Sequence, residues 1–358
     1  MESLVKTSIA LSFALVIFLL GTPILAANSM AEAYVEQGKR AFDRGDLIAA
    51  KRLFNKAAVT SVRSSDDQLH MAAIFNNAGE AYRRIYELRG PSYQVDDDDI
   101  ETARWLVKIF PREDFAPEDL PGRPAWLALC FLNIAVEFKE KQLGSFSLDV
   151  SRSLENLAAL NQALGRQDEA EALLRKAIQI HETKEGVRAL SIAPLCYRLG
   201  ISLKERADKH TDSQARIAAL QDAITNFQRA DKIWTGTQSS PELLCAVDKN
   251  LSLALFDLFG ENKDCQNLAK SESYFDEAKN RFLKNQPALK KSYEQFKSDP
   301  EVQTFLLQSF ACRWKAVADL KKSDDSLPAS AADELVNLMK SAKRVDRMDD
   351  YKWAQAKY

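Results

Sequence analysis

The fold is decided by residues Leu154 to Ile178, which read LENLAALNQALGRQDEAEALLRKAI. Large and small side chains share one helical face in the first half, at the spacing i, i+3, i+4 and i+7: Leu154, Leu157, Ala158 and Asn161. The second half repeats this arrangement: Ala170, Leu174 and Ala177. Gly165 lies between the halves, where a helix end favours a residue that tolerates positive φ. Small side chains at a crossing let two helices approach closely, so the stretch predicts two antiparallel helices with a turn at Gly165.

This pattern resembles the tetratricopeptide repeat (TPR), a helix pair with a large residue, an apolar-small pair, a glycine turn and then a small-large-small series. Looser copies recur along the chain, beginning near Tyr34, Phe75, Cys196 and Leu251.

The period of the repeats is longer than the common value of about 34 residues. Gly38 and Gly79 are 41 residues apart (79 − 38), and Leu157 and Leu199 are 42 apart (199 − 157). This period resembles that of the repeats in kinesin light chains and similar bacterial proteins.

The resemblance implies an all-α protein, a right-handed superhelical solenoid of helix-turn-helix pairs. The expected segments are a signal peptide or anchor, N-terminal helix pairs, a Pro-rich loop, a central array with insertions, and a degenerate C-terminal repeat with a capping helix: 1–27, 28–110, 111–125, 126–285 and 286–358. The helix Trp126–Lys141 is interpreted as a first helix without a second helix of its own. The Pro-rich loop is interpreted as a spacer between two stacked units or, less favourably, as a lid over the groove.

The first 27 residues have the layout of a secretory signal peptide. Lys6 precedes an apolar run from Ile9 to Leu20, and Ala26 and Ala27 offer a cleavage site. The run is shorter than the roughly 20 residues of a membrane span. We therefore expect export to the periplasm or outside the cell, with an uncleaved membrane anchor facing out of the cytoplasm as the alternative.

Composition and motifs argue against several functions. The net charge of −2 leaves no basic excess for nucleic-acid binding. His70, His181 and His210 have no partners at metal-ligand spacing, and there is no phosphate-binding glycine loop or nucleophile motif. We therefore expect no enzyme, no cofactor, no metal and no catalytic residue.

Two further features have structural explanations that we prefer to functional ones. The acidic run from Asp96 to Asp99 suits a helix N-terminus better than a calcium loop, which needs a central glycine and spaced ligands. Cysteines in helical patterns are interpreted as small packing residues rather than disulfides, and Cys265 as the most exposed thiol.

A concentration of asparagine marks the candidate binding surface. In this family the residue before the apolar-small pair points into the concave groove of the first helices. Aligned on that pair, and including the helix through Ile134-Ala135, the position holds Glu36, Asn77, Asn133, Asn156, Arg198 and Asn250. Basic residues at neighbouring first-helix positions would line the same groove: Lys39, Arg83, Lys139 and Lys204.

An amide both donates and accepts, so it can pair with the backbone of a bound peptide. The same amides could instead hydrogen-bond a neighbouring helix and hold the repeats together, and the sequence leaves the two roles open. The expected function is an exported scaffold or adaptor that binds a peptide or helix of a protein partner. The alternatives are a membrane-anchored envelope assembly factor and, less favoured, an enzyme or small-ligand receptor.

Overall fold

The computed structural model describes residues 30–64, 67–90, 93–111, 123–237 and 239–262, with scattered positions from 267 to 280 and residue 300. The chain divides into two compact units at Val187 and Arg188. The predicted signal peptide, Cys265 and the predicted C-terminal repeat lie outside the described residues. Among the described residues, no helix is both long and apolar enough to cross a membrane.

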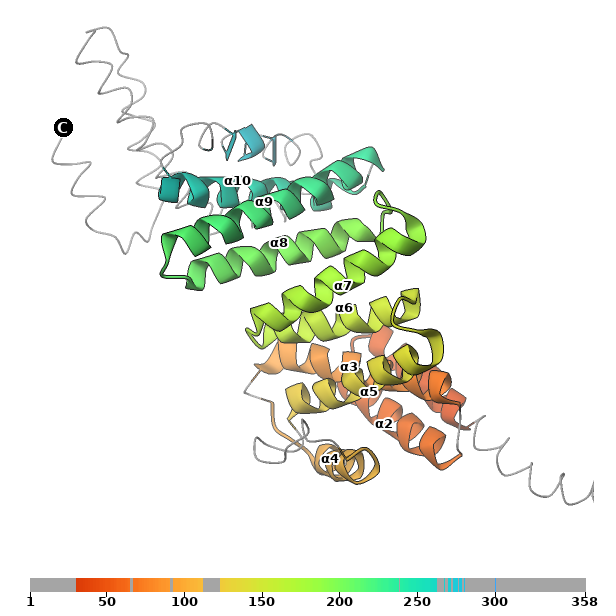
Figure 1. Cartoon of the computed structure of the whole chain (residues 1–358). Coiled ribbons are helices and arrows are strands. Elements are labelled where there is room, and N and C mark those ends of the chain that lie inside the picture. Colours follow the sequence, from red (N-terminus) through yellow and green to blue (C-terminus); the bar gives the residue numbers. More distant parts are fainter. Residues whose placement is uncertain are drawn as a thin grey trace, which may run out of the picture. The chain divides into compact units, whose positions relative to one another are not determined.

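The first unit consists of helices in its described part (Figure 1). Residues 30–43 are helical. Six further helices follow in this unit: α2 (Leu47–Arg63), α3 (Gln68–Arg89), α4 (Asp97–Ile109), α5 (Pro124–Leu143), α6 (Leu148–Ala163) and α7 (Gln167–Glu185). The second unit contains α8 (Ile192–Lys209), α9 (Ser213–Gly236) and α10 (Pro241–Asn262). The described residues of both units contain no strand, so the predicted all-α class is confirmed.

The turns between paired helices form where the sequence predicts them. Gly165 has a φ of 72° and Gly45 a φ of 79°, a region that side chains other than glycine disfavour. Asp46 then begins α2, because its carboxylate accepts a hydrogen bond of 3.0 Å from the Ala49 backbone N–H.

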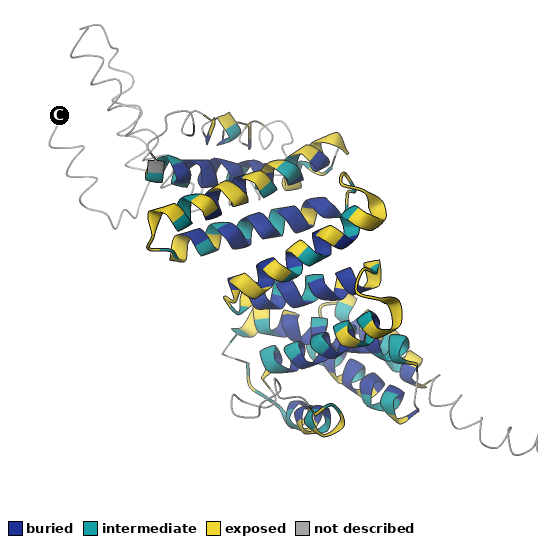
Figure 2. Cartoon of the chain, in the orientation of Figure 1, coloured by how far each residue is buried: buried dark blue, intermediate teal, exposed yellow. Residues whose placement is uncertain are grey.

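Close contacts between glycines and large side chains define the helix pairs. A Cβ on Gly38 would lie 2.6 Å from Phe54 of α2, and one on Gly200 would lie 2.6 Å from Phe227 of α9. Both are contacts of a first helix with its own second helix. In Figure 2, α7 and α9 each have a buried and an exposed face, whereas α8 and α10 are mostly buried.

The same contact corrects the interpretation of the helix predicted at Trp126–Lys141. A Cβ on Gly79 of α3 would lie 2.6 Å from the Leu132 side chain of α5, as Gly38 meets Phe54. Helix α5 is therefore the second helix of the pair that α3 begins, and the prediction that it is a first helix was wrong. The error arose because residues 90–123, with α4, separate the two halves of one repeat.

The acidic run begins α4, as the helix-terminus interpretation predicts. Asp96 caps the helix by accepting a hydrogen bond from the Asp99 backbone N–H, and the Asp99 carboxylate accepts one from the Asp96 backbone N–H. This reciprocal capping box satisfies two of the donors that a helix N-terminus leaves without partners. Cys130, Cys196 and Cys245 are buried among the helices, which agrees with a packing role.

Candidate peptide-binding surface

In the first unit, the predicted asparagines lie on first helices but in different surroundings. Asn77 is half-buried on α3, and its side chain makes no hydrogen bond to the described residues. Asn156 is half-buried on α6, and its Nδ2 donates to Oδ1 of Asn76 on α3 over 3.3 Å. Asn156 therefore connects two first helices, which supports the packing role that the sequence left open, while Asn77 keeps its amide available to a ligand.

A series of buried hydrogen bonds connects α5 and α6 to Asn76, the partner of Asn156. The Lys139 ammonium of α5 donates to Ser153 Oγ over 2.8 Å and to the Asp149 carbonyl over 3.1 Å. Ser153 Oγ in turn donates to Asn76 Oδ1 over 3.0 Å. Burial lowers the pKa of Lys139, against the attraction of Asp149. Lys139 is thus buried between α5 and α6, and it does not add exposed positive charge to the groove as we expected.

The other basic residues predicted in this unit pair with carboxylates of their own helices. Lys39 lies 2.9 Å from Glu36, and both side chains are exposed. Arg83 is buried between Glu80, at 2.6 Å, and Glu87. Although burial opposes it, these carboxylates raise the pKa of Arg83. The surface is therefore close to electrically neutral around Arg83.

Asn133 does not occupy the position that the alignment gave it. It follows Leu132 on α5, which is a second helix, and it is half-buried there. The groove of the family is formed by first helices, so Asn133 is not equivalent to Asn77 and Asn156.

The second unit contains the remaining predicted residues. Asn250 of α10 donates to the Tyr197 hydroxyl over 2.9 Å and to the Ala246 carbonyl over 2.9 Å. Burial raises the pKa of Tyr197, which keeps its hydroxyl protonated. Arg198, the next residue on α8, is half-buried. Asn250 thus repeats, in this unit, the bond between first helices that Asn156 makes in the other.

Lys204 belongs to a charged cluster at the end of α8. Its ammonium lies 3.7 Å from Asp208 and 3.5 Å from Asp257 of α10. Burial raises the pKa of Asp257 to about 6, although Lys204 acts against this rise. Lys204 is therefore partly neutralised by two carboxylates.

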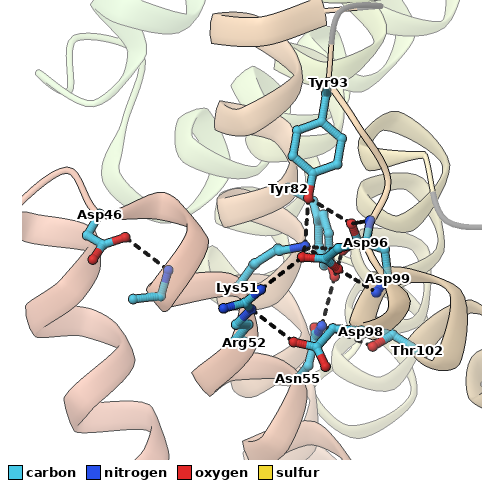
Figure 3. A network of polar contacts seen from close by, with 11 residues as sticks. Asp46, Lys51, Arg52, Asn55, Tyr82, Tyr93, Asp96, Asp98, Asp99 and Thr102 are labelled. Carbon is cyan, nitrogen blue, oxygen red and sulfur yellow. Dashed lines mark hydrogen bonds and ion pairs between the residues drawn. The ribbon is translucent and has the colours of Figure 1, made fainter.

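The sequence did not predict the most deeply buried ion pair of the described residues. Lys51 of α2 and Asp99 of α4 form it, and both side chains are fully buried. Lys51 also donates to Tyr93 over 2.6 Å and to Asp96 over 3.0 Å (Figure 3). A lysine on an amphipathic helix usually lies on the exposed face, so the local sequence pattern did not indicate that Lys51 is buried. Among the described residues, no cluster of His, Cys, Asp and Glu could hold a metal ion.

Comparison with known proteins identifies the repeat. Residues 150–188, which contain α6 and α7, match the tetratricopeptide repeat family model. The chain therefore contains a tetratricopeptide repeat at these residues. No curated protein is significantly similar to it in sequence. A TPR helix pair supports the coarse prediction of a protein-interaction scaffold.

Solved structures of TPR proteins are similar to this chain at low identity. The putative-kinesin-light-chain repeats of Podosopora anserina, described as nearly identical TPR-like repeats, share 15% identity and have a TM-score of 0.48. The match covers 73% of this chain and 98% of that one. BtubC (BKLC) from P. vanneervenii shares 19% identity with a TM-score of 0.37, covering 72% and 90% of the two chains.

Proposed function

We propose that this TPR protein is an exported adaptor that binds a peptide or helix of a partner protein on its first helices. The observation that carries the proposal is the half-buried amide of Asn77, which makes no hydrogen bond to the described residues. Such an amide offers a donor and an acceptor to the backbone of a bound segment. Asn156 and Asn250 contribute by holding neighbouring first helices in place.

Site-specific crosslinking tests the binding surface. A photoreactive amino acid replaces Asn77 in one variant and Asn226 in a control, because Asn226 is half-buried like Asn77 but lies on the second helix α9, where its Nδ2 donates to the Asp222 carbonyl. We expect a protein crosslinked from residue 77 and not from residue 226. A partner that crosslinks equally from both positions contradicts binding on the first helices.

Replacement of the predicted asparagines then tests their role. Asn77→Ala alone should weaken capture of the crosslinked partner without loss of helicity. The triple variant with Asn156→Ala and Asn250→Ala should weaken it further, partly by loosening the first helices. Unchanged capture by both variants contradicts a contribution from the amides.

Export has a separate test. The proposal rests on Lys6, the apolar run from Ile9 to Leu20 and the small residues after it. Mass spectrometry of the chain from the producing cell should show a mature form lacking about 26 or 27 residues. A full-length form in the membrane fraction would favour the alternative, a membrane-anchored envelope assembly factor.

A further inference from the structure

Helix α4 interrupts a TPR without belonging to either half of it. It lies between α3 and α5 in sequence, and those two helices form the pair. A helix pair needs only a short turn between its members, as at Gly45 and Gly165. Helix α4 is therefore an addition to the repeat, and its contacts show what surface it covers.

The polar end of that surface recognises a carboxylate. Lys51 of α2 binds the Asp99 carboxylate, and the Tyr82 hydroxyl of α3 donates to the same group over 3.0 Å. Asn55 of α2 donates to Thr102, one turn further along α4, over 3.0 Å. As Figure 3 shows, donors from α2 and α3 converge on side chains of α4. The repeat thus presents a lysine, a phenol and an amide in fixed positions.

The apolar end of the surface is aromatic. Leu106 of α4 is fully buried, and Phe110 at the end of α4 lies 5.6 Å from Phe75 of α3 and 5.9 Å from Phe138 of α5 between ring centroids. Both ring pairs meet edge to face, an arrangement that stabilises aromatic contacts. Helix α4 therefore contacts the repeat as an amphipathic helix contacts a receptor, with a charged anchor at one end and an aromatic anchor at the other.

Two features of the contact reduce its net stability. The Lys51–Asp99 pair is fully buried, and the cost of desolvating both charges offsets most of their attraction. In addition, the buried Oδ1 of Asn55 has no hydrogen-bond partner among the described residues, and a buried acceptor without a partner is destabilising. The ion pair thus contributes more to specificity than to stability, as expected of a segment that can be exchanged.

We propose that α4 occupies, within its own chain, a docking surface for a partner helix on α2, α3 and α5. The partner helix displaces α4 and reproduces its anchors: a carboxylate, an apolar side chain seven residues later and an aromatic ring eleven residues later, as in Asp99, Leu106 and Phe110 (106 − 99 and 110 − 99). This surface shares no residue with the predicted asparagine surface, so the inference does not depend on the proposed function.

A peptide that copies residues 93–110 tests the proposal by fluorescence anisotropy with the full chain. Leu106→Ser in the chain removes the buried apolar anchor of its own α4 and leaves Lys51, Phe75 and Phe138 intact. Glu101→Ser, on the exposed side of α4, is the matched control. We expect the L106S chain to bind the peptide at least about tenfold more tightly than the wild-type and E101S chains, because a tethered α4 competes at a high effective concentration.

The peptide variant Asp99→Asn should bind the L106S chain at least about tenfold more weakly than the wild-type peptide, because the Lys51 ammonium loses its fully buried carboxylate partner and keeps only Asp96. Equal binding of the peptide to the wild-type and L106S chains, or no binding to either, overturns the proposal. A dimeric L106S chain in analytical ultracentrifugation also overturns it, because the occupant would then be α4 of a second copy.

Hydrogen exchange on the wild-type chain tests the proposal independently of whether the L106S chain folds. Amides of α4 should exchange faster than those of α3 and α5 if α4 detaches by itself. Equal protection of all three helices shows that α4 is an integral part of the repeat and overturns the proposal.

Discussion

Asn77, Asn156 and Asn250 hold the same position in their first helices, yet their surroundings give them different roles. Asn156 and Asn250 each hydrogen-bond a side chain of the neighbouring first helix. Asn77 makes no such bond to the described residues. A hydrogen bond between helices stabilises their packing, whereas an amide without a partner at a half-buried site is available to a ligand. One residue type therefore serves packing at two positions and remains a candidate for binding at the third.

This difference predicts different effects on stability. Asn250→Ala should lower the free energy of unfolding by about 1 kcal/mol, because the largely buried Tyr197 hydroxyl loses a partner. Asn77→Ala should change it by less than about 0.5 kcal/mol. Urea unfolding followed by circular dichroism measures both values. Equal losses in the two variants would show that Asn77 also has a packing role.

Asp257 predicts a pH dependence. Its folded pKa of about 6 lies above the ordinary 3.8 because the carboxyl is buried, so the folded state binds this proton more tightly than the unfolded state. The resulting stabilisation is complete below pH 3.8 and is lost as the pH rises through 6. The side chain is 28% exposed and faces Lys204, Asp208 and Arg216, which moderates the effect.

Asp257→Asn should therefore stabilise the chain by about 1 kcal/mol at pH 7.5, and by about half as much at pH 5. Urea midpoints at the two pH values measure the difference. Asp222→Asn, an exposed carboxylate on α9, is the control and should show no such pH dependence. An equal effect of D257N at both pH values would contradict a raised pKa.

At the scale of the element, the contact of Gly79 with Leu132 decides which helices form a pair. Gly79 lacks a Cβ, so α5 approaches α3 as closely as α2 approaches the helix of residues 30–43. Local sequence predicted that α5 was a helix, but its partner lies on the other side of α4. The pairing of α3 with α5 depends on contacts between residues that are separated by the segment 90–123. Patterns within one helix do not show such contacts.

A double-mutant cycle tests this pairing. Gly79→Ala should cost about 1–3 kcal/mol because the new methyl group overlaps Leu132, and Leu132→Ala about 2–5 kcal/mol. The double variant should lose less than the sum of the two, because the shorter side chain at 132 makes room for the methyl group. Gly236→Ala is the control, since a Cβ there meets nothing within 4 Å. Strict additivity of the first two changes would contradict the α3–α5 pair.

At the scale of the whole molecule, each repeat is stabilised mainly by its neighbours, as in other repeat proteins. The core of the first unit connects Phe54, Phe75, Leu132 and Leu157, which come from α2, α3, α5 and α6. The second unit has a separate compact core. Damage at one repeat should therefore weaken nearby helices before distant ones.

Gly79→Ala should accordingly increase hydrogen exchange in α2, α3 and α5 while leaving the protection of α8 and α9 unchanged. Mass-spectrometric exchange on peptides from both units measures this effect. Increased exchange of similar size in α8 and α9 would show that the two units unfold as one cooperative body.

The helical class, the turns and the repeat followed from the sequence alone, because they depend on local properties. Gly165 and Gly45 adopt positive φ where turns were predicted, and the spacing of Leu154, Leu157 and Ala158 places them on one buried face. Such patterns need only the geometry of one helix and its immediate neighbour.

Three features depend on how distant helices pack: which helix pairs with α3, how Lys51 is neutralised, and which asparagine keeps its amide available. Lys51 and Asp99 are 48 residues apart, and Asn76 and Asn156 are 80 apart. The pairing of such side chains depends on the packing of several helices together. The sequence does not distinguish an asparagine that binds a ligand from one that binds a neighbouring helix. The role of each polar residue follows from the groups that the fold places beside it.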